Sequence, residues 1–146
     1  MTALESLMGM MPNKVGENVL VTPVSSAKDK IESLPKYVWN SKTKFLDPAC
    51  KNGIVLYEVY KTLMETEALI EEFPEDKDRH NHILKNQLYG VAMDGMCQLV
   101  SIRTVYGHLT PDNNILNSEE LQLRVGEGFV RAIEKAFGDM KFDVVF

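Results

Sequence analysis

The residues from Asp47 to Gly53 combine a carboxylate, a thiol, a lysine and a glycine in one short turn between two apolar segments. The apolar pair before the turn is typical of a strand end, and apolar residues recur at helical spacing from Ile54 onward. Asp47 and Pro48 are expected to stop the strand, and the glycine lets backbone and ligand approach closely. Nucleotides bind at such turns in open α/β sheets. We interpret residues 47–53 as a cofactor loop, although Asp-Pro also marks many ordinary turns.

Other residue types that could do chemistry are few. Cys50 and Cys97 lack the spacing of metal ligands and are interpreted as buried or reduced thiols. His80 and His82, one residue apart, could both bind a metal. Metal sites usually need three or four ligands in a supporting shell, and the sequence has no other cluster of histidine and cysteine. No metal site is expected.

The composition fits one compact domain. The chain has 146 residues, of which 45% are hydrophobic, so it is large enough to bury a core. No apolar run approaches the ~20 residues that span a bilayer, and residues 1–11 lack the pattern of a signal peptide, so we expect no membrane association and a cytoplasmic location. The formal net charge of -5 gives no electrostatic footprint for phosphate backbones. Tight binding of duplex DNA by this chain alone is therefore not expected.

The elements that must position the loop alternate between helices and strands. Residues 1–15 are predicted to be a docking helix or a loose arm, and residues 65–79 an acidic, solvated helix end and loop. Pro23 suits the first turn of a helix that Thr22 would cap. Apolar spacing predicts helices at 24–34, 54–64, 96–106 and 126–137, and strands at 44–46, 87–93, 114–116 and 141–146.

In order and content, these pieces resemble the amino-terminal half of the γ-type DNA adenine-N6 methyltransferases, the modification enzymes of restriction systems. Residues 16–23 look like the leading Thr-Pro segment of that family, 45–53 like its first cofactor motif, 88–94 like its second strand and loop, and 114–121 like its third loop. Residues 142–146, Phe-Asp-Val-Val-Phe, look like the strand that runs into the catalytic Asn/Asp-Pro-Pro-Tyr motif. The resemblance covers most of residues 16–146.

The resemblance implies an α/β, Rossmann-like fold dependent on S-adenosylmethionine, truncated after the fourth strand, with residues 16–146 as a partial methyltransferase domain. Asp47 would face the amino group of the methionine moiety, Met93 the adenine ring and Glu119 its exocyclic amine. A carboxylate suits a ligand that carries an ammonium and a sulfonium. The implied cofactor-binding residues are Thr22, Pro23, Asp47, Pro48, Ala49, Cys50, Gly53, Met93, Asp94 and Glu119.

Two departures from the family pattern imply weak binding of the cofactor. Lys51 stands where the family loop has its first glycine, which adds a positive charge near a cationic ligand. Ala92 stands where the family has the carboxylate that binds both ribose hydroxyls. Loss of a charged hydrogen-bond partner costs about 1.5–3 kcal/mol, roughly ten- to a hundredfold in affinity. Asp94, two residues on, could compensate through a shifted loop.

A third departure concerns catalysis. The family places its catalytic motif after the strand that here reaches Phe146, and its target-recognition domain further on. The chain alone is therefore expected to be inactive, with DNA bound through regions that it lacks and a restriction endonuclease subunit or domain as an implied partner. Two alternatives stay open: a degenerate methyltransferase-like structural or interaction module, and a methyltransferase acting on RNA or protein.

Overall fold

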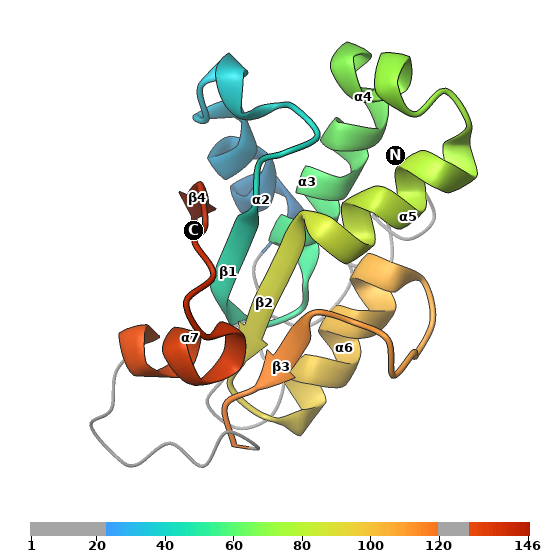
Figure 1. The fold of residues 1–146 in the computed structure, drawn as a ribbon. Coiled ribbons are helices and arrows are strands. Elements are labelled where there is room, and N and C mark those ends of the chain that lie inside the picture. Colours follow the sequence, from blue (N-terminus) through green and yellow to red (C-terminus); the bar gives the residue numbers. More distant parts are fainter. Residues whose placement is uncertain (1–22, 120–128) are drawn as a thin grey trace.

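A computed structural model of the chain describes residues 23–119 and 129–146. Its centre is a sheet of four parallel strands in the order β3-β2-β1-β4 (Figure 1). The strands are β1 (Phe45–Cys50), β2 (Leu88–Ala92), β3 (Ile115–Asn117) and β4 (Val144–Val145). The helices are α2 (Val24–Glu32), the short 3-10 helix η1 (Lys36–Val38), α3 (Ile54–Glu65), α4 (Glu67–Glu72), α5 (Asp76–Asn86), α6 (Gly95–Tyr106) and α7 (Phe129–Phe137).

The strand order reverses direction beside β1. The chain runs outward from β1 through β2 to β3 and then returns to place β4 on the other side of β1. Open α/β sheets bind ligands outside the carboxyl ends of their strands at such a reversal. The predicted α/β class is confirmed, and the parallel sheet is compatible with a Rossmann-like fold.

Helices cover both faces of the sheet. Side chains alternate between the two faces along a strand. In β2, Gly90 faces Leu56 of α3, whereas the ring of the adjacent Tyr89 meets the ring of Phe137 in α7, with centroids 5.5 Å apart. The main core lies on the α3 side, where Phe45, Leu56, Leu63 and Leu88 are almost fully buried.

The predicted end of the first strand was wrong. Asp47 and Pro48 were expected to stop the strand, but β1 continues to Cys50, which pairs with Ala92 of β2. The pairing register shifts between Asp47 and Cys50. A bulge of this kind accommodates a proline, which has no N–H to give to the ladder. The segment 47–53, which the sequence analysis interprets as a cofactor loop, therefore begins inside the sheet.

Other boundaries differ in smaller ways. The acidic segment is mostly helical, because α4 and the start of α5 lie within it. Pro23 is the N-cap residue of α2, with φ -65° and ψ 153°, instead of a residue of its first turn. The last predicted strand is confined to the two residues of β4. Thr22 and the predicted arm at 1–15 lie outside the described residues.

Candidate functional site

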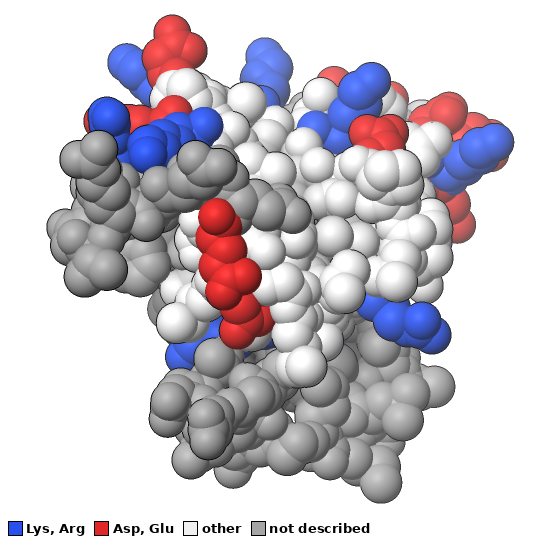
Figure 2. Space-filling model, turned by 90° about the horizontal axis from the view of Figure 1, so that it is seen from below, with Lys and Arg blue, Asp and Glu red and all other residues white. Residues whose placement is uncertain are grey.

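The turns that leave β1, β2 and β3 meet at the carboxyl edge of the sheet. Cys50 pairs with Ala92 and Ala92 with Asn117, so the three strand ends are neighbours. Figure 2 shows the molecule from this end: in the described part, uncharged side chains occupy most of the middle, acidic atoms form a narrow strip, and most basic side chains lie toward the rim. Most of the predicted cofactor residues end β1 or lie just beyond β1 or β2.

Asp47 is the central charged group of this edge. Its side chain is buried, with 8% exposure, and its Oδ1 accepts a hydrogen bond from the backbone N–H of Ala49 at 3.1 Å. Burial raises the pKa of the Asp47 carboxyl above its ordinary value, and the Ala49 N–H and the charges of Lys30 and Lys51 oppose the rise. A largely desolvated carboxylate of this kind gains from a bound cation.

Gly53 closes the turn and begins α3. Its φ of +77° lies in the left-handed region, where side chains are strained. A Cβ at this position would also stand 2.8 Å from the Cα of Ser101 and 2.9 Å from its carbonyl oxygen. The preceding Asn52 is buried, and its Oδ1 accepts a hydrogen bond from the N–H of Ile54. The sequence correctly predicts a close backbone approach here, but the described neighbour is α6.

The middle of the loop divides between the surface and the core. Pro48 and Ala49 are half-buried, whereas Cys50 is fully buried in the main core. The Cys50 Sγ donates to the carbonyl oxygen of Asp47 at 3.4 Å, and it would stand 2.5 Å from a Cβ added to Gly90. The side chain of Cys50 therefore packs in the core and does not face a ligand.

The exit of β2 holds an exposed methionine between Ala92 and Asp94. Ala92 is fully buried in the main core. Met93 is 49% exposed at the strand end, where a flat apolar ligand could contact it. The Asp94 carboxylate accepts a hydrogen bond from the N–H of Cys97 at 2.8 Å and so caps α6. This capping bond uses Oδ1 of the carboxylate that the sequence analysis considered as a substitute ribose ligand.

The exit of β3 contains a polar residue that the sequence analysis missed. Asn117 ends the strand, is 5% exposed, and its Oδ1 accepts a hydrogen bond from the N–H of the exposed Glu119. Ser118 ties the turn to its neighbour, because its N–H donates to the Ala92 carbonyl and its hydroxyl to the Met93 carbonyl. The sequence analysis predicted this strand at 114–116. A predicted strand one residue longer would have placed Asn117 at the strand end.

Two further predicted positions flank this edge. Lys51 is half-buried, and its charge acts on both Asp47 and Cys97, so it lies between the β1 turn and the start of α6. Pro23 stands at the start of α2, which packs against α3 through Ala27. The structure thus brings the β1, β2 and β3 turns together, with Lys51 between the first two.

Neither thiol is prepared for nucleophilic chemistry. Burial raises the pKa of Cys50 well above its ordinary value, and burial together with Asp94 raises the pKa of Cys97 to about 11. Both are thus protonated at neutral pH, whereas the thiolate is the form that attacks or binds metal. Among residues 23–119 and 129–146, no group of three or more histidine, cysteine or acidic side chains could hold a metal ion.

The two neighbouring histidines of α5 point to different partners. His80 Nδ1 lies 2.7 Å from the Tyr60 hydroxyl of α3, whereas His82 Nε2 lies 2.7 Å from the Ser41 carbonyl oxygen. Residues two apart on a helix do not share a face. His80 and His82 therefore do not converge on one ligand.

Comparison with known proteins adds no assignment to this geometry: no protein-family model matches the sequence, and no curated protein is significantly similar to it. In the part of the chain that the structure describes, no helix has both the length and the apolar character needed to cross a membrane.

Proposed function

We propose that this chain is the cofactor-binding part of a γ-type DNA adenine-N6 methyltransferase and that it binds S-adenosylmethionine at the carboxyl edge of the sheet. The observation that carries the proposal is the buried Asp47 carboxylate in the carboxyl half of β1, beside the reversal of strand order and on the strand that leads to the left-handed turn at Gly53. The sheet order and the resemblance of residues 16–146 support it.

The chemistry of the ligand suits this edge. Asp47 would pair with the α-ammonium group of the methionine moiety, which relieves the cost of a buried carboxylate. The positive end of the helix dipole at the start of α3 would favour the carboxylate of the ligand. Met93 would contact the adenine ring from the neighbouring turn.

The proposed role of this chain is binding of the cofactor without catalysis. The 146 residues contain no Asn-Pro-Pro-Tyr or Asp-Pro-Pro-Tyr motif, so this chain alone would bind the cofactor without transferring the methyl group. DNA would be bound by other parts of the enzyme, in the cytoplasm, with a restriction endonuclease as partner.

Calorimetric titration with S-adenosylmethionine tests the proposal. The chain should bind it with a dissociation constant in the high micromolar to millimolar range, and Asp47→Asn should weaken binding about ten- to a hundredfold because it removes a charge-assisted partner. Asp139→Asn, at an exposed position outside the site, is the matched control and should change nothing. Equal binding by the Asp47 variant and the parent chain would rule out the proposed pocket.

The alternative is a degenerate module in which this pocket no longer binds a cofactor. Two observations favour it: Lys51 already places a positive charge near Asp47, and the fully buried Ala92 offers no group for the ribose hydroxyls. No detectable heat at millimolar S-adenosylmethionine would support this alternative.

The Lys51→Ala variant distinguishes a pocket that binds the cofactor weakly from one that no longer binds it. If Lys51 competes with the ammonium group of the ligand for Asp47, its removal should tighten binding severalfold. Lys42→Ala, which removes an exposed lysine elsewhere, is the control. If the Lys51→Ala variant still shows no binding of S-adenosylmethionine, the chain is the degenerate module.

A further inference from the structure

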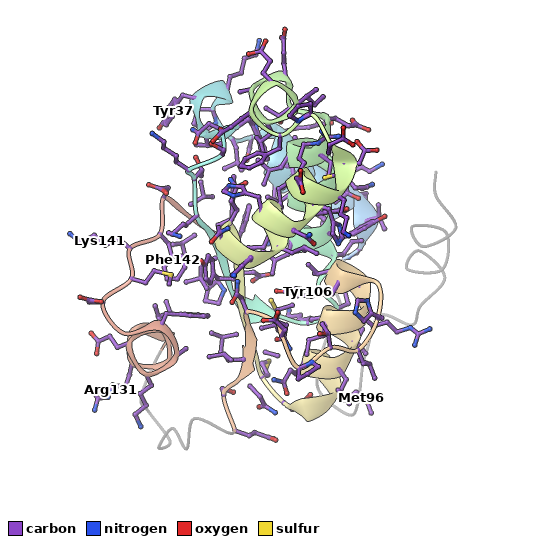
Figure 3. The ribbon with its side chains drawn as sticks, turned by 45° about the vertical axis from the view of Figure 1, so that its right-hand side comes forward. Tyr37, Met96, Tyr106, Arg131, Lys141 and Phe142 are labelled. Carbon is purple, nitrogen blue, oxygen red and sulfur yellow. The ribbon has the colours of Figure 1, made fainter. Side chains whose placement is uncertain are left out.

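A concave site lies at the opposite edge of the sheet from the proposed cofactor turn. It is a half-open hollow of about 360 Å³ between α5 and the loop that leads from α6 to β3. The α5 side contributes His80, Asn81, Leu84 and Lys85, and the other side contributes Tyr106, His108, Thr110, Asp112, Asn113 and Asn114. Figure 3 shows Tyr106 at the end of α6, next to α5. The volume is that of small-molecule pockets.

The wall of this hollow is held in place by its own hydrogen bonds. The Asn114 side-chain amide donates to the carbonyl oxygens of Leu84, Lys85 and Leu88, which fixes the loop to the end of α5. The Tyr106 hydroxyl accepts from the N–H of Asn114 and donates to the Leu84 carbonyl oxygen. The site is therefore built before any ligand arrives.

These internal bonds engage several acceptors of the wall and leave several donors without a partner in the described part of the chain. The Tyr106 oxygen, the Asn113 Oδ1 and the carbonyl oxygens of Leu84 and Lys85 each accept a bond from within the wall. In contrast, the Lys85 ammonium, the Asn81 amide and the His108 ring have no bonding partner among the described residues.

His80 adds one more donor. Its Nδ1 is 2.7 Å from the Tyr60 hydroxyl, which does not line the hollow. Burial and the nearby His108 lower the pKa of His80, so the neutral ring is favoured at pH 7. If Tyr60 donates to Nδ1, the neutral ring carries its proton on Nε2 and can offer that N–H to a ligand.

We propose that this hollow binds the oxyanion group of a small molecule, a phosphate ester or a carboxylate, with Lys85, His80 and His108 as its donors. The inference is independent of the proposed cofactor site, which lies at the other edge of the sheet. Asp112 is the one carboxylate of the wall, so the anion would lie on the α5 side, away from it.

Titration of the whole chain with inorganic phosphate and, separately, with acetate tests the proposal, with ring and backbone NMR shifts as the readout. Saturable shifts of His80 and His108 are expected, while His82, on the same helix but bonded to Ser41, stays unchanged. The stronger of the two probes identifies the ligand as a phosphate ester or a carboxylate. No saturable shift at tens of millimolar of either anion would overturn the proposal.

Charge variants give the decisive comparison. Lys85→Ala should weaken binding of the stronger probe about tenfold, whereas Lys77→Ala, an exposed lysine of the same helix outside the hollow, should not change it. Asp112→Asn should tighten binding about two- to fivefold, because it removes a like charge. Weaker anion binding by the Asp112 variant, or tight binding of Zn²⁺ in place of the anion, would show that the hollow serves cations.

Discussion

At the scale of single residues, the buried charge of Asp47 lowers the stability of the folded protein but would favour binding of a cationic ligand. Its carboxylate is buried beside one backbone N–H, with two lysines acting only at longer range. A group with a raised pKa in the folded state makes the native protein less stable once it is ionised. The chain therefore retains a residue that costs stability at neutral pH, which is common where a ligand supplies the missing partner.

Asp47→Asn should raise the melting temperature at pH 7. The amide oxygen of the introduced asparagine can still accept from Ala49, while the buried charge is gone. Because the pKa is raised on folding, stability due to this group is fully present below the unfolded pKa of about 4 and is lost as the pH rises through the folded value. Thermal melts should therefore show a gain at pH 7 that disappears below about pH 4. A lower melting temperature at pH 7 would contradict the sign.

The same titration should appear in ligand binding. Protonation of Asp47 removes the charge that pairs with the ammonium group, so affinity for S-adenosylmethionine should fall as the pH drops through the raised pKa. Calorimetry from pH 7 down to the acid limit of folding measures this. The Asp47→Asn variant is the control, since its weaker binding should not follow the same pH profile.

At the scale of elements, the tight packing of β1, β2, α3 and α6 sets the shape of the carboxyl edge of the sheet. Gly90 makes room in β2 for the Cys50 Sγ, and Gly53 makes room for the backbone of α6. A Cβ added at either glycine would stand closer to its neighbour than real Cβ atoms do, so the Cys50 side chain or the α6 backbone would have to shift. The end of β1 and the start of α3 are therefore held by their neighbours.

A double-mutant cycle should reveal the pairing of Gly90 with Cys50. Gly90→Ala alone should destabilise the protein by about 1–3 kcal/mol, because the new methyl group meets the Sγ. Cys50→Ala in the same chain removes that sulfur, so the double variant should be more stable than the sum of the single changes predicts, by about 0.5–3 kcal/mol. Urea unfolding of all four proteins measures the coupling. Simple additivity would mean that Cys50 is not the obstacle.

Gly53→Ala should cost more stability than Gly107→Ala. Both glycines have positive φ, +77° and +82°, so both substitutions introduce backbone strain of about 1–3 kcal/mol. Only at Gly53 does the new Cβ also collide with a backbone, whereas nothing lies within 4 Å at Gly107. The difference between the two unfolding free energies isolates the packing of α3 against α6. Equal losses would show that the Ser101 contact relaxes freely.

The sequence predicted the elements better than it predicted side-chain directions. The helix after Gly53, the strand through Tyr89 and the helix from Gly95 are present because their apolar periods are long and regular. The end of β1 was misplaced because Pro48 was interpreted as a stop, although a bulge accommodates it. The burial of Cys50 was predicted from its residue type, and the structure confirms it, but its place at the end of β1 was not predicted. Asn117 was missed because β3 has only three residues, so its end could not be located from the sequence pattern.

At the scale of the whole molecule, stability is concentrated in the inner strands. β1 and β2 each pair on both sides, whereas β4 contributes two residues and, in the described part of the chain, pairs only with β1. Local opening follows the number of buried contacts and backbone bonds that must break. The turn proposed to bind the cofactor leaves an inner strand, β1, and the hollow lies near the other end of β2.

Hydrogen exchange should follow this gradient. The N–H groups of Val144 and Phe146, which bond to Lys44 and Leu46, should exchange faster than that of Phe45 in the inner strand β1, which bonds to Gln87 at the start of β2. Exchange monitored by NMR at neutral pH measures this order. Protection of β4 equal to that of β1 would indicate that the sheet opens as one cooperative unit.

The contact between Gly53 and Ser101 has an evolutionary consequence. No side chain separates the turn from the helix at this point, so the fit has no tolerance for even one added carbon atom. A lineage that replaces the glycine must shift the backbone of α6. Because the nearest atoms are the Cα and carbonyl oxygen of Ser101, the clash does not depend on the side chain at 101, and position 53 should stay glycine in related sequences whatever residue stands at 101.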